Sequence, residues 1–223
     1  MAFLVVPAGG KGTRMRTEAP KQFMDFKGMP LLKATIGAFF GSGMPTIEGV
    51  ALALPPDRVT EVEGWTFPAP HWCAVGGETR QESVANALAL LADRPEAIVL
   101  IHDAVRPFPP AGPILEAIRL IESSECDCAI LAEVSTDTLK RVDPSLNILA
   151  TEPRESIYRA QTPQAARLAT WREAMTWAKE RGFCATDDAS VLEVMGKTVR
   201  VVPSPSSNWK LTVPEDLERI GKR

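Results

Sequence analysis

The chain has 223 residues, of which 45% are hydrophobic, and this is enough to bury the core of one α/β domain. Its formal net charge of -3 and the lack of a lysine and arginine block argue against nucleic acid or a membrane surface as the main partner. No apolar run reaches membrane-spanning length, no signal-peptide pattern precedes the first strand-like run, and the four cysteines lack the spacing of a zinc site or a disulfide framework. We therefore expect a soluble, cytoplasmic protein with reduced thiols.

Short apolar runs typical of strands alternate with segments of helical periodicity along the chain. Strands are predicted at Phe3–Pro7, Gly49–Leu54, Ala97–His102, Cys128–Val134 and Thr198–Pro203. Helices are predicted at Leu31–Phe40, Thr79–Leu91, Gly112–Ser123, Ala165–Arg181 and Asp187–Met195. This alternation predicts one Rossmann-like, doubly wound α/β domain over residues 1–223, with a mostly parallel sheet. In such folds ligands bind beyond the carboxyl ends of the strands, so the loops there are the first place to look for a site.

The first predicted strand ends in a glycine-rich loop, Pro7–Met15, which is followed by Pro20-Lys21-Gln22. Its glycines let the backbone adopt positive φ and bring bare N–H groups close to an anion. Arg14 and Lys21 add positive charge beside these dipoles. The spacing matches neither the Walker loop nor Gly-x-Gly-x-x-Gly, so the loop predicts a nucleotide site of another kind. A plain glycine turn between a strand and a helix is the alternative.

Two later segments carry possible chemistry. Gly76–Ser83 is either a turn followed by a capped helix or a place where bare backbone approaches a flat base edge. Asp103 follows an apolar run and is well placed to hold Mg²⁺, which takes one or two carboxylates and completes its shell with water and phosphate oxygens. Alternatively, Asp103 caps the next turn and pairs with Arg106. His102 has no Ser or Cys partner at a motif spacing, so a hydrolase triad has no support.

The segment Thr136–Pro153 interrupts the alternation, because two short extended runs flank a turn signal there. It predicts a β-hairpin arm without a core of its own. Such an arm packs either on a partner subunit, which would make the protein a homodimer, or back on its own domain. Near the C-terminus, Lys210 precedes a helix start at Thr212 or Val213, and by composition alone it is a surface lysine.

Motifs follow one another in order along about residues 3–218. They are Gly9-Gly10-x-Gly12-x-Arg14-Met15 with Pro20-Lys21-Gln22, Gly76-Gly77 with Arg80 and Ser83, His102-Asp103-Ala104 with Arg106-Pro107, Ala160-Gln161-Thr162-Pro163-Gln164, Thr186-Asp187-Asp188-Ala189-Ser190, and Asn208-Trp209-Lys210 with Pro214-Glu215-Asp216-Leu217. This pattern closely resembles the 2-C-methyl-D-erythritol 4-phosphate cytidylyltransferase family. The resemblance implies transfer of CMP from CTP to methylerythritol phosphate with release of pyrophosphate, a step of non-mevalonate isoprenoid precursor biosynthesis. It also implies Mg²⁺ and usually a homodimer.

The resemblance further implies roles for individual residues. Arg14 and Lys21 would stabilise the charge on the α-phosphate and the departing pyrophosphate, whereas Arg154 and Lys210 would position the methylerythritol phosphate. Asp103 would hold the metal. In the family the counterpart of Arg154 comes from the arm, which is consistent with a site shared across a dimer. The other expected positions line CTP (Ala8, Gly9, Gly10), face cytosine (Gly77, Glu78, Ser83), complete the nucleotide site with Asp103 (Ala104, Arg106) and face the sugar alcohol (Thr138, Thr162, Thr186).

Some positions depart from the common family pattern. Gly9 and Lys11 give a loop that is also similar to ribitol 5-phosphate cytidylyltransferases and sugar-nucleotide pyrophosphorylases, and Glu78 stands where a shorter Asp is often found. The segment Thr186–Ser190 favours the methylerythritol family, so ribitol 5-phosphate is the alternative substrate. Another alternative is a nucleotide-binding regulatory subunit without turnover. The retained charges at the catalytic and metal positions argue against it, because like charges are costly to hold together without a phosphate partner.

Overall fold

A computed structural model of the chain describes residues 1–10, 20–212 and 216. Within these residues the main sheet has seven strands, in the order β11-β7-β10-β6-β1-β4-β5. The strands are β1 Ala2–Pro7, β4 Ile47–Leu54, β5 His71–Val75, β6 Ile98–Ile101, β7 Cys128–Val134, β10 Tyr158–Arg167 and β11 Val199–Pro203. All neighbours pair in parallel except β10, which is antiparallel to both β6 and β7. The predicted mostly parallel α/β sheet is confirmed.

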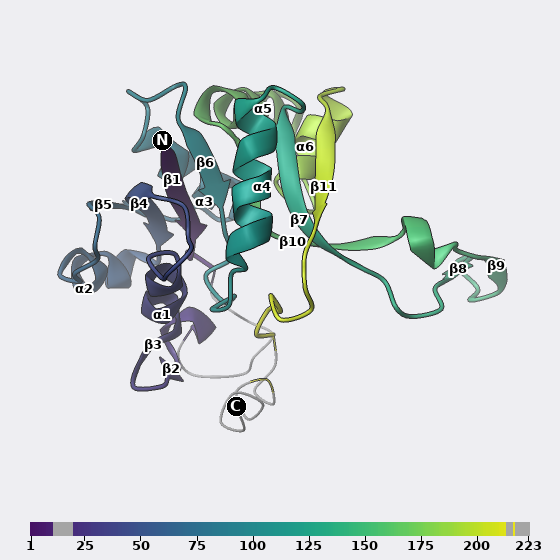
Figure 1. Cartoon of the computed structure of the whole chain (residues 1–223), viewed down its shortest axis with the longest axis horizontal. Coiled ribbons are helices and arrows are strands. Elements are labelled where there is room, and N and C mark those ends of the chain that lie inside the picture. Colours follow the sequence, from purple (N-terminus) through teal and green to yellow (C-terminus); the bar gives the residue numbers. More distant parts are fainter. Residues whose placement is uncertain (11–19, 213–215, 217–223) are drawn as a thin grey trace.

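Helices cover both faces of the sheet (Figure 1). The α-helices are α1 Leu31–Ala38, α2 Val59–Glu63, α3 Arg80–Ala89, α4 Ala111–Glu122, α5 Leu168–Arg181 and α6 Ala189–Val194. Short 3₁₀ turns are η2 Lys21–Phe23, η3 Pro56–Arg58 and η4 Arg154–Ser156, and β2 Asp25–Phe26 pairs with β3 Met29–Pro30 as a small hairpin. Side chains of α1, α2 and α4 pack on one face, and those of α3, α5 and α6 pack on the other. This is the doubly wound arrangement expected from the sequence.

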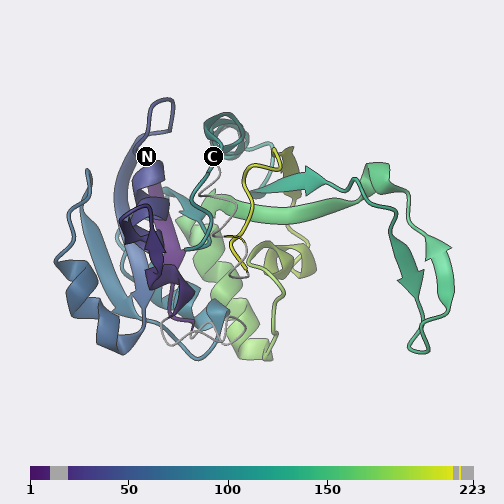
Figure 2. The same cartoon turned by 90° about the horizontal axis from the view of Figure 1, so that it is seen from below.

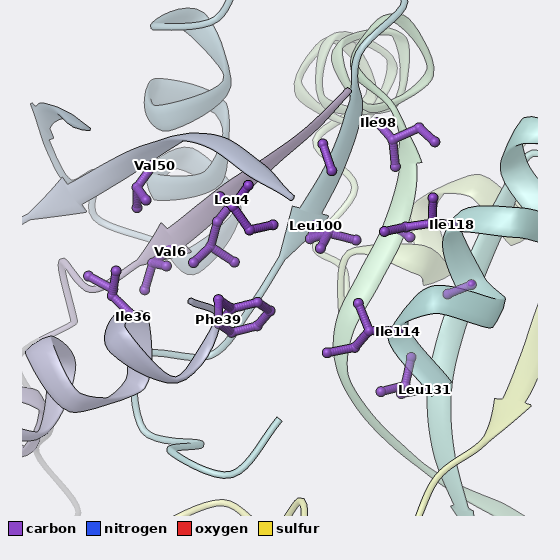
Figure 3. Close-up of a cluster of buried hydrophobic side chains, with 14 of the residues drawn as sticks. Leu4, Val6, Ile36, Phe39, Val50, Ile98, Leu100, Ile114, Ile118 and Leu131 are labelled. Atoms are coloured by element: carbon purple, nitrogen blue, oxygen red, sulfur yellow. The ribbon is translucent and has the colours of Figure 1, made fainter. Parts of the chain in front are cut away.

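The core on the first face is built from branched and aromatic side chains of the central strands and two helices (Figure 3). Its labelled members are Leu4, Val6, Ile36, Phe39, Val50, Ile98, Leu100, Ile114, Ile118 and Leu131. Because helices cover both faces, β1 is buried over Ala2–Val6 rather than at alternate positions. The continuous burial fixes the end of β1, and with it the start of the glycine-rich loop.

Strands β5 and β10 were not predicted from the sequence, and one predicted helix begins too early. Residues 165–167 continue β10, so the helix expected at Ala165–Arg181 starts at Leu168. Tertiary pairing overrides the local pattern here, because β10 is held between β6 and β7 by antiparallel ladders. The predicted helix start at Thr212 or Val213 falls largely outside the described residues.

The predicted hairpin arm is present, with β8 Lys140–Val142 paired to β9 Ile148–Thr151. The arm projects away from the body of the molecule, at the end of the ribbon formed by β7 and β10 (Figures 1 and 2). Leu146 is 79% exposed, and Ile148 and Leu149 are each 64% exposed. The arm therefore offers an apolar surface that its own chain leaves open to solvent.

The described part of the chain contains no helix that is both long and apolar enough to cross a bilayer. All four cysteines are unpaired thiols.

Candidate active site

A pocket with a volume of about 270 Å³ opens beyond the carboxyl ends of β1, β5 and β6. This is the position expected for ligands in an open α/β sheet. Its walls come from residues 7–10 of the glycine-rich loop, η2, the turn before α3, the loop after β6 and the C-terminal segment, residues 204–211. The lining residues are Pro7, Ala8, Gly9, Gly10, Lys21, Gln22, Gly77, Glu78, Thr79, Arg80, Ser83, Asp103, Ala104, Val105 and Lys210.

The described part of the glycine-rich loop is held by the side chain of Gln22. This buried amide donates hydrogen bonds to the carbonyl oxygens of Ala8 at 2.6 Å and Gly10 at 3.0 Å. The same turn of η2 carries Lys21 into the pocket lining. The loop and its lysine are therefore fixed relative to each other.

Gly9 lies against the turn that follows β5. A Cβ added to Gly9 would approach Gly76 Cα to 2.9 Å, and one added to Gly76 would approach Gly9 Cα to 2.8 Å. Neither Gly9 nor Gly10 has a positive φ, so the positive φ expected for the loop is wrong at these two positions. Glycine is required at position 9 because the backbones of Gly9 and Gly76 approach so closely that no side chain fits between them.

The turn before α3 is closed by its own polar groups. Thr79 and Glu82 form a capping box at the start of the helix. Ser83 Oγ accepts a hydrogen bond from Gly77 N at 3.1 Å and donates one to Thr79 O at 3.0 Å. The Glu78 backbone N–H donates to Glu82 Oε2 at 2.7 Å. The capped helix start predicted for this segment is therefore confirmed, and it forms one wall of the pocket. The approach of its backbone to a base edge stays a prediction.

Asp103 is the buried anion of the pocket. Its Oδ2 accepts from Arg106 Nε at 3.1 Å and lies 3.0 Å from Lys210 Nζ, while its Oδ1 accepts from Arg80 Nη2 at 3.3 Å. Burial alone would raise the pKa of Asp103, but the charges of Arg80, Lys210 and Arg106 together hold that pKa well below its usual range. The carboxylate is ionised at neutral pH.

Behind Asp103 lies a buried relay of hydrogen bonds. The Asp103 backbone N–H donates to Thr162 Oγ1 at 3.0 Å, and this hydroxyl lies 3.1 Å from His102 Nδ1. His102 Nε2 lies 3.0 Å from the carbonyl oxygen of Arg106. Burial lowers the pKa of His102 to about 4, so the ring is neutral at pH 7. A proton on Nε2 satisfies every contact, because Thr162 then donates to Nδ1 and the ring donates to Arg106.

Arg80 joins the pocket to the start of α6. One guanidinium nitrogen contacts Asp103, and another makes a short hydrogen bond to Asp188 Oδ1. Asp188 is only 2% exposed, and its Oδ2 has no hydrogen-bond partner among the described residues. The two carboxylates therefore share one cation at the wall of the pocket.

The whole chain resembles one family of known proteins. A family model for 2-C-methyl-D-erythritol 4-phosphate cytidylyltransferase matches residues 2–221. The chain belongs to this family. The cytidylyltransferase of Acidobacterium capsulatum is 38% identical over 97% of this chain and 94% of its own length, and that of Geotalea uraniireducens is 36% identical over 96% and 92%.

Solved structures agree with the family assignment. The cytidylyltransferase of Francisella tularensis has a TM-score of 0.83 at 29% identity, and covers 99% of this chain and 98% of its own. The enzyme of Thermus thermophilus has a TM-score of 0.75 at 31% identity, covering 99% and 97%. The predicted enzyme class is confirmed: the chain is a cytidylyltransferase that uses CTP and 2-C-methyl-D-erythritol 4-phosphate.

In this cytidylyltransferase, most residues expected at the site line one pocket. They are Ala8, Gly9, Gly10, Lys21, Gly77, Glu78, Ser83, Asp103, Ala104 and Lys210. Arg106 and Thr162 lie behind Asp103 and contact it. Thr186 is exposed before α6, and Thr138 and Arg154 are exposed on and beside the arm, outside the pocket lining. Arg14 lies outside the described residues.

The sequence motifs contain Gln22, Arg80, Asp188 and Asn208, but the sequence alone predicts no role for these four residues. At this wall of the pocket, the local sequence announces only the capping box of Thr79 and Glu82, since Thr-x-x-Glu marks a helix start. Arg80 and Asp188 meet although they are 108 residues apart in the chain. Contacts of this kind depend on how the strands are ordered in the sheet, which no local pattern reports.

The close approach of Gly9 and Gly76 leads to a prediction for Gly76→Ala. The new Cβ would lie 2.8 Å from Gly9 Cα, which is backbone and cannot rotate away. We expect a loss of about 1–3 kcal/mol in the free energy of unfolding, as in other overpacked sites. We also expect weaker CTP binding, because both pocket walls must move apart. Urea unfolding and titration with CTP measure the two effects.

Gly112→Ala is the control, because Gly112 lies in α4 and a Cβ there meets nothing within 4 Å. It should bind CTP normally. Unchanged stability and CTP affinity in Gly76→Ala would contradict the argument.

Proposed function

We propose that cytidylyl transfer takes place in the pocket between the glycine-rich loop and Asp103. The observation that carries this proposal is that one pocket is lined by residues 7–10 of the glycine-rich loop together with Gly77, Lys21, Asp103 and Lys210. In the reaction, a phosphate oxygen of the second substrate attacks the α-phosphorus of CTP in line. A new P–O bond forms as the bond to the β-phosphate breaks, and pyrophosphate leaves with the electron pair. Since the attacking oxygen is already anionic at neutral pH, positioning and charge neutralisation supply the catalysis.

Lys21 and Arg14 would neutralise the triphosphate. Lys21 lines the pocket on the turn that Gln22 ties to Ala8 and Gly10, which supports a fixed position relative to the loop. The loop would contribute bare backbone N–H groups to the phosphates. Preorganised donors of this kind act without reorganising at the moment of reaction.

Gly77, Glu78 and Ser83 would face the cytosine. The Ser83 hydroxyl and the backbone N–H groups of Gly77 and Glu78 already make hydrogen bonds within the turn. Recognition of the base would therefore rely on the acceptors that remain, namely backbone carbonyls and the side chains. Glu78 is exposed at the pocket wall, so its longer side chain has room to adjust.

Mg²⁺ would bind Asp103 together with phosphate oxygens. The described residues contain no cluster of three His, Cys, Asp or Glu side chains, so an all-protein metal cage is not available among them. One carboxylate beside a triphosphate pocket fits the usual Mg²⁺ chemistry. The ion would neutralise charge on the phosphates. Asp103 would offer it carboxylate oxygens, of which Oδ2 now contacts both Arg106 and Lys210.

The second substrate would be held by Lys210 and by Arg154 of a partner subunit. Arg154 lies in η4 next to the arm, and its side chain is 60% exposed. The arm, residues 136–153, carries an apolar surface that a second copy of the chain would cover. We therefore propose a homodimer joined through the arms, with Thr138, Thr162 and Thr186 near the sugar alcohol. Residues 1–223 would form one nucleotidyltransferase domain that works in the cytoplasm.

The decisive test is pyrophosphate release by the purified protein with CTP and Mg²⁺. Methylerythritol 4-phosphate and ribitol 5-phosphate are supplied in parallel reactions. We expect turnover with methylerythritol 4-phosphate. Turnover with ribitol 5-phosphate alone would assign the alternative substrate, and CTP binding without turnover on either substrate would indicate a regulatory subunit.

A further inference from the structure

The C-terminal segment that carries Lys210 is anchored by a buried asparagine. Asn208 is fully buried, and its Nδ2 donates to Gln161 Oε1 and to the carbonyl oxygen of Thr162, both at 2.9 Å. At either end of the segment, backbone bonds join Ser204 N to Ala132 O at 2.8 Å and Leu211 N to Val105 O at 3.0 Å. Asn208 thus ties the middle of the segment to β10.

The same asparagine closes a ring of hydrogen bonds around Asp103. Its backbone carbonyl oxygen accepts from Arg106 Nη1 at 2.7 Å, while Arg106 Nε donates to Asp103 Oδ2. Asp103 N donates in turn to Thr162 Oγ1, and the carbonyl of Thr162 accepts from Asn208. The ring fixes the C-terminal segment relative to the Asp103 carboxylate. Lys210 follows Asn208 by two residues in the same segment, and its Nζ lies 3.0 Å from Asp103 Oδ2.

We propose that Asn208 is a positioning residue for Lys210, and this inference rests on the proposed role of Lys210 toward the second substrate. Asn208 is not among the residues that line the pocket. Its effect on the reaction therefore passes through residues that it holds in place, and Lys210 is the residue of its own segment that lines the pocket. Holding a charged group in a near-attack arrangement is worth orders of magnitude in rate, and small displacements from outside the reacting centre remove much of that gain.

Both hydrogens of the amide group are needed at position 208. The two partners of Nδ2 are oxygen acceptors, and one of them is a backbone carbonyl that cannot exchange roles. Alanine would leave both acceptors buried without a donor. Aspartate would keep the shape of the side chain but would present an anion to the same carbonyl.

The test compares steady-state kinetics of Asn208→Ala and Asn208→Asp with those of the unchanged enzyme, varying CTP and methylerythritol 4-phosphate separately. We expect the KM for methylerythritol 4-phosphate to rise about tenfold to a hundredfold, with an unchanged KM for CTP. Either variant suffices if the other does not fold. A normal KM for methylerythritol 4-phosphate, or an equal rise for both substrates, would overturn the proposal.

Trp171→Phe is the matched control for lost stability. Trp171 is fully buried on the face of the sheet that α3, α5 and α6 cover, and its Nε1 donates to the carbonyl of Val99 at 3.2 Å. The variant also strips a donor from a buried main-chain carbonyl. It should lower Tm without altering either KM, so a kinetic change shared with Asn208→Ala would point to a general loss of stability.

A double variant separates action through Lys210 from an independent effect. If Asn208 acts through the lysine, Lys210→Ala with Asn208→Ala should lose no more kcat/KM than Lys210→Ala alone. Losses that multiply would overturn the proposal. Failure of the proposed function is recognised separately, because the unchanged enzyme would then not turn over methylerythritol 4-phosphate at all.

Discussion

Lys21→Ala is expected to lower kcat by about 10²–10³-fold while the protein stays folded, the usual effect of removing one preorganised donor from developing charge. Lys21 lines the pocket, and its turn is tied to the glycine-rich loop through Gln22. Arg14→Ala should have a similar effect if it serves the same triphosphate. The rate of pyrophosphate release at saturating substrates measures kcat, and circular dichroism checks the fold.

Lys197→Ala is the control for loss of a lysine. Lys197 pairs with Glu173 at 3.0 Å, outside the pocket lining, and its replacement should leave kcat unchanged. Near-normal rates in both Lys21→Ala and Arg14→Ala would remove the catalytic role proposed for the loop.

Mixing two inactive variants should restore activity if the site is shared between subunits. Arg154→Ala alters the contribution next to the arm, and Lys210→Ala alters the contribution at the pocket. In an equal mixture of exchanging subunits, half of the dimers are mixed, and each of these has one site with both residues intact. We expect recovery of about a quarter of the unmodified activity, as the two-fold symmetry of a dimer requires.

The control mixture combines Lys210→Ala with Lys21→Ala. Both residues line the same pocket of one chain, so every site in a mixed dimer lacks one of them, and no recovery is expected. Recovery in both mixtures, or in neither, would contradict a site completed by the partner's arm. Full activity of Arg154→Ala alone would also contradict it.

Most of the fold could be predicted because its strands are continuous apolar runs. Residues Ala2–Val6 of β1 are buried on both faces and follow this rule. Strand β10 does not, because it buries Gln161 and Gln164 and contains Pro163. The Gln164 side chain bonds to Asp187 at 2.7 Å and to the backbone N–H of Ala189 at 2.9 Å. A polar sequence of this kind becomes a central strand through partners that lie beyond any local window.

The residues of the candidate site also fall into a group that the local sequence predicts and a group that it does not. Asp103 and Lys21 were predicted because they follow strand ends and glycines, where chemistry is expected in this fold. Arg80 and Asn208 were not, because their partners are fixed by sheet order and by the irregular pairing of β10 with β7. Between the pairs Ala160–Ala132 and Gln164–Ile130 the ladder is irregular, and Thr162 turns there to Asp103. Such irregularities commonly direct a side chain into an active site.

The contact between Gly9 and Gly76 has a consequence for the entropy of binding. Two pocket walls meet there through glycine backbone and beside the Ser83 hydroxyl, which is already hydrogen-bonded within the turn, so no further rotamer has to be fixed at that contact when a nucleotide binds. The conformational entropy lost on binding then comes from the long side chains of Lys21 and Lys210, each of which loses rotamer freedom when it binds a phosphate. Because Lys210 is already held by Asp103, part of that loss is incurred during folding rather than during binding.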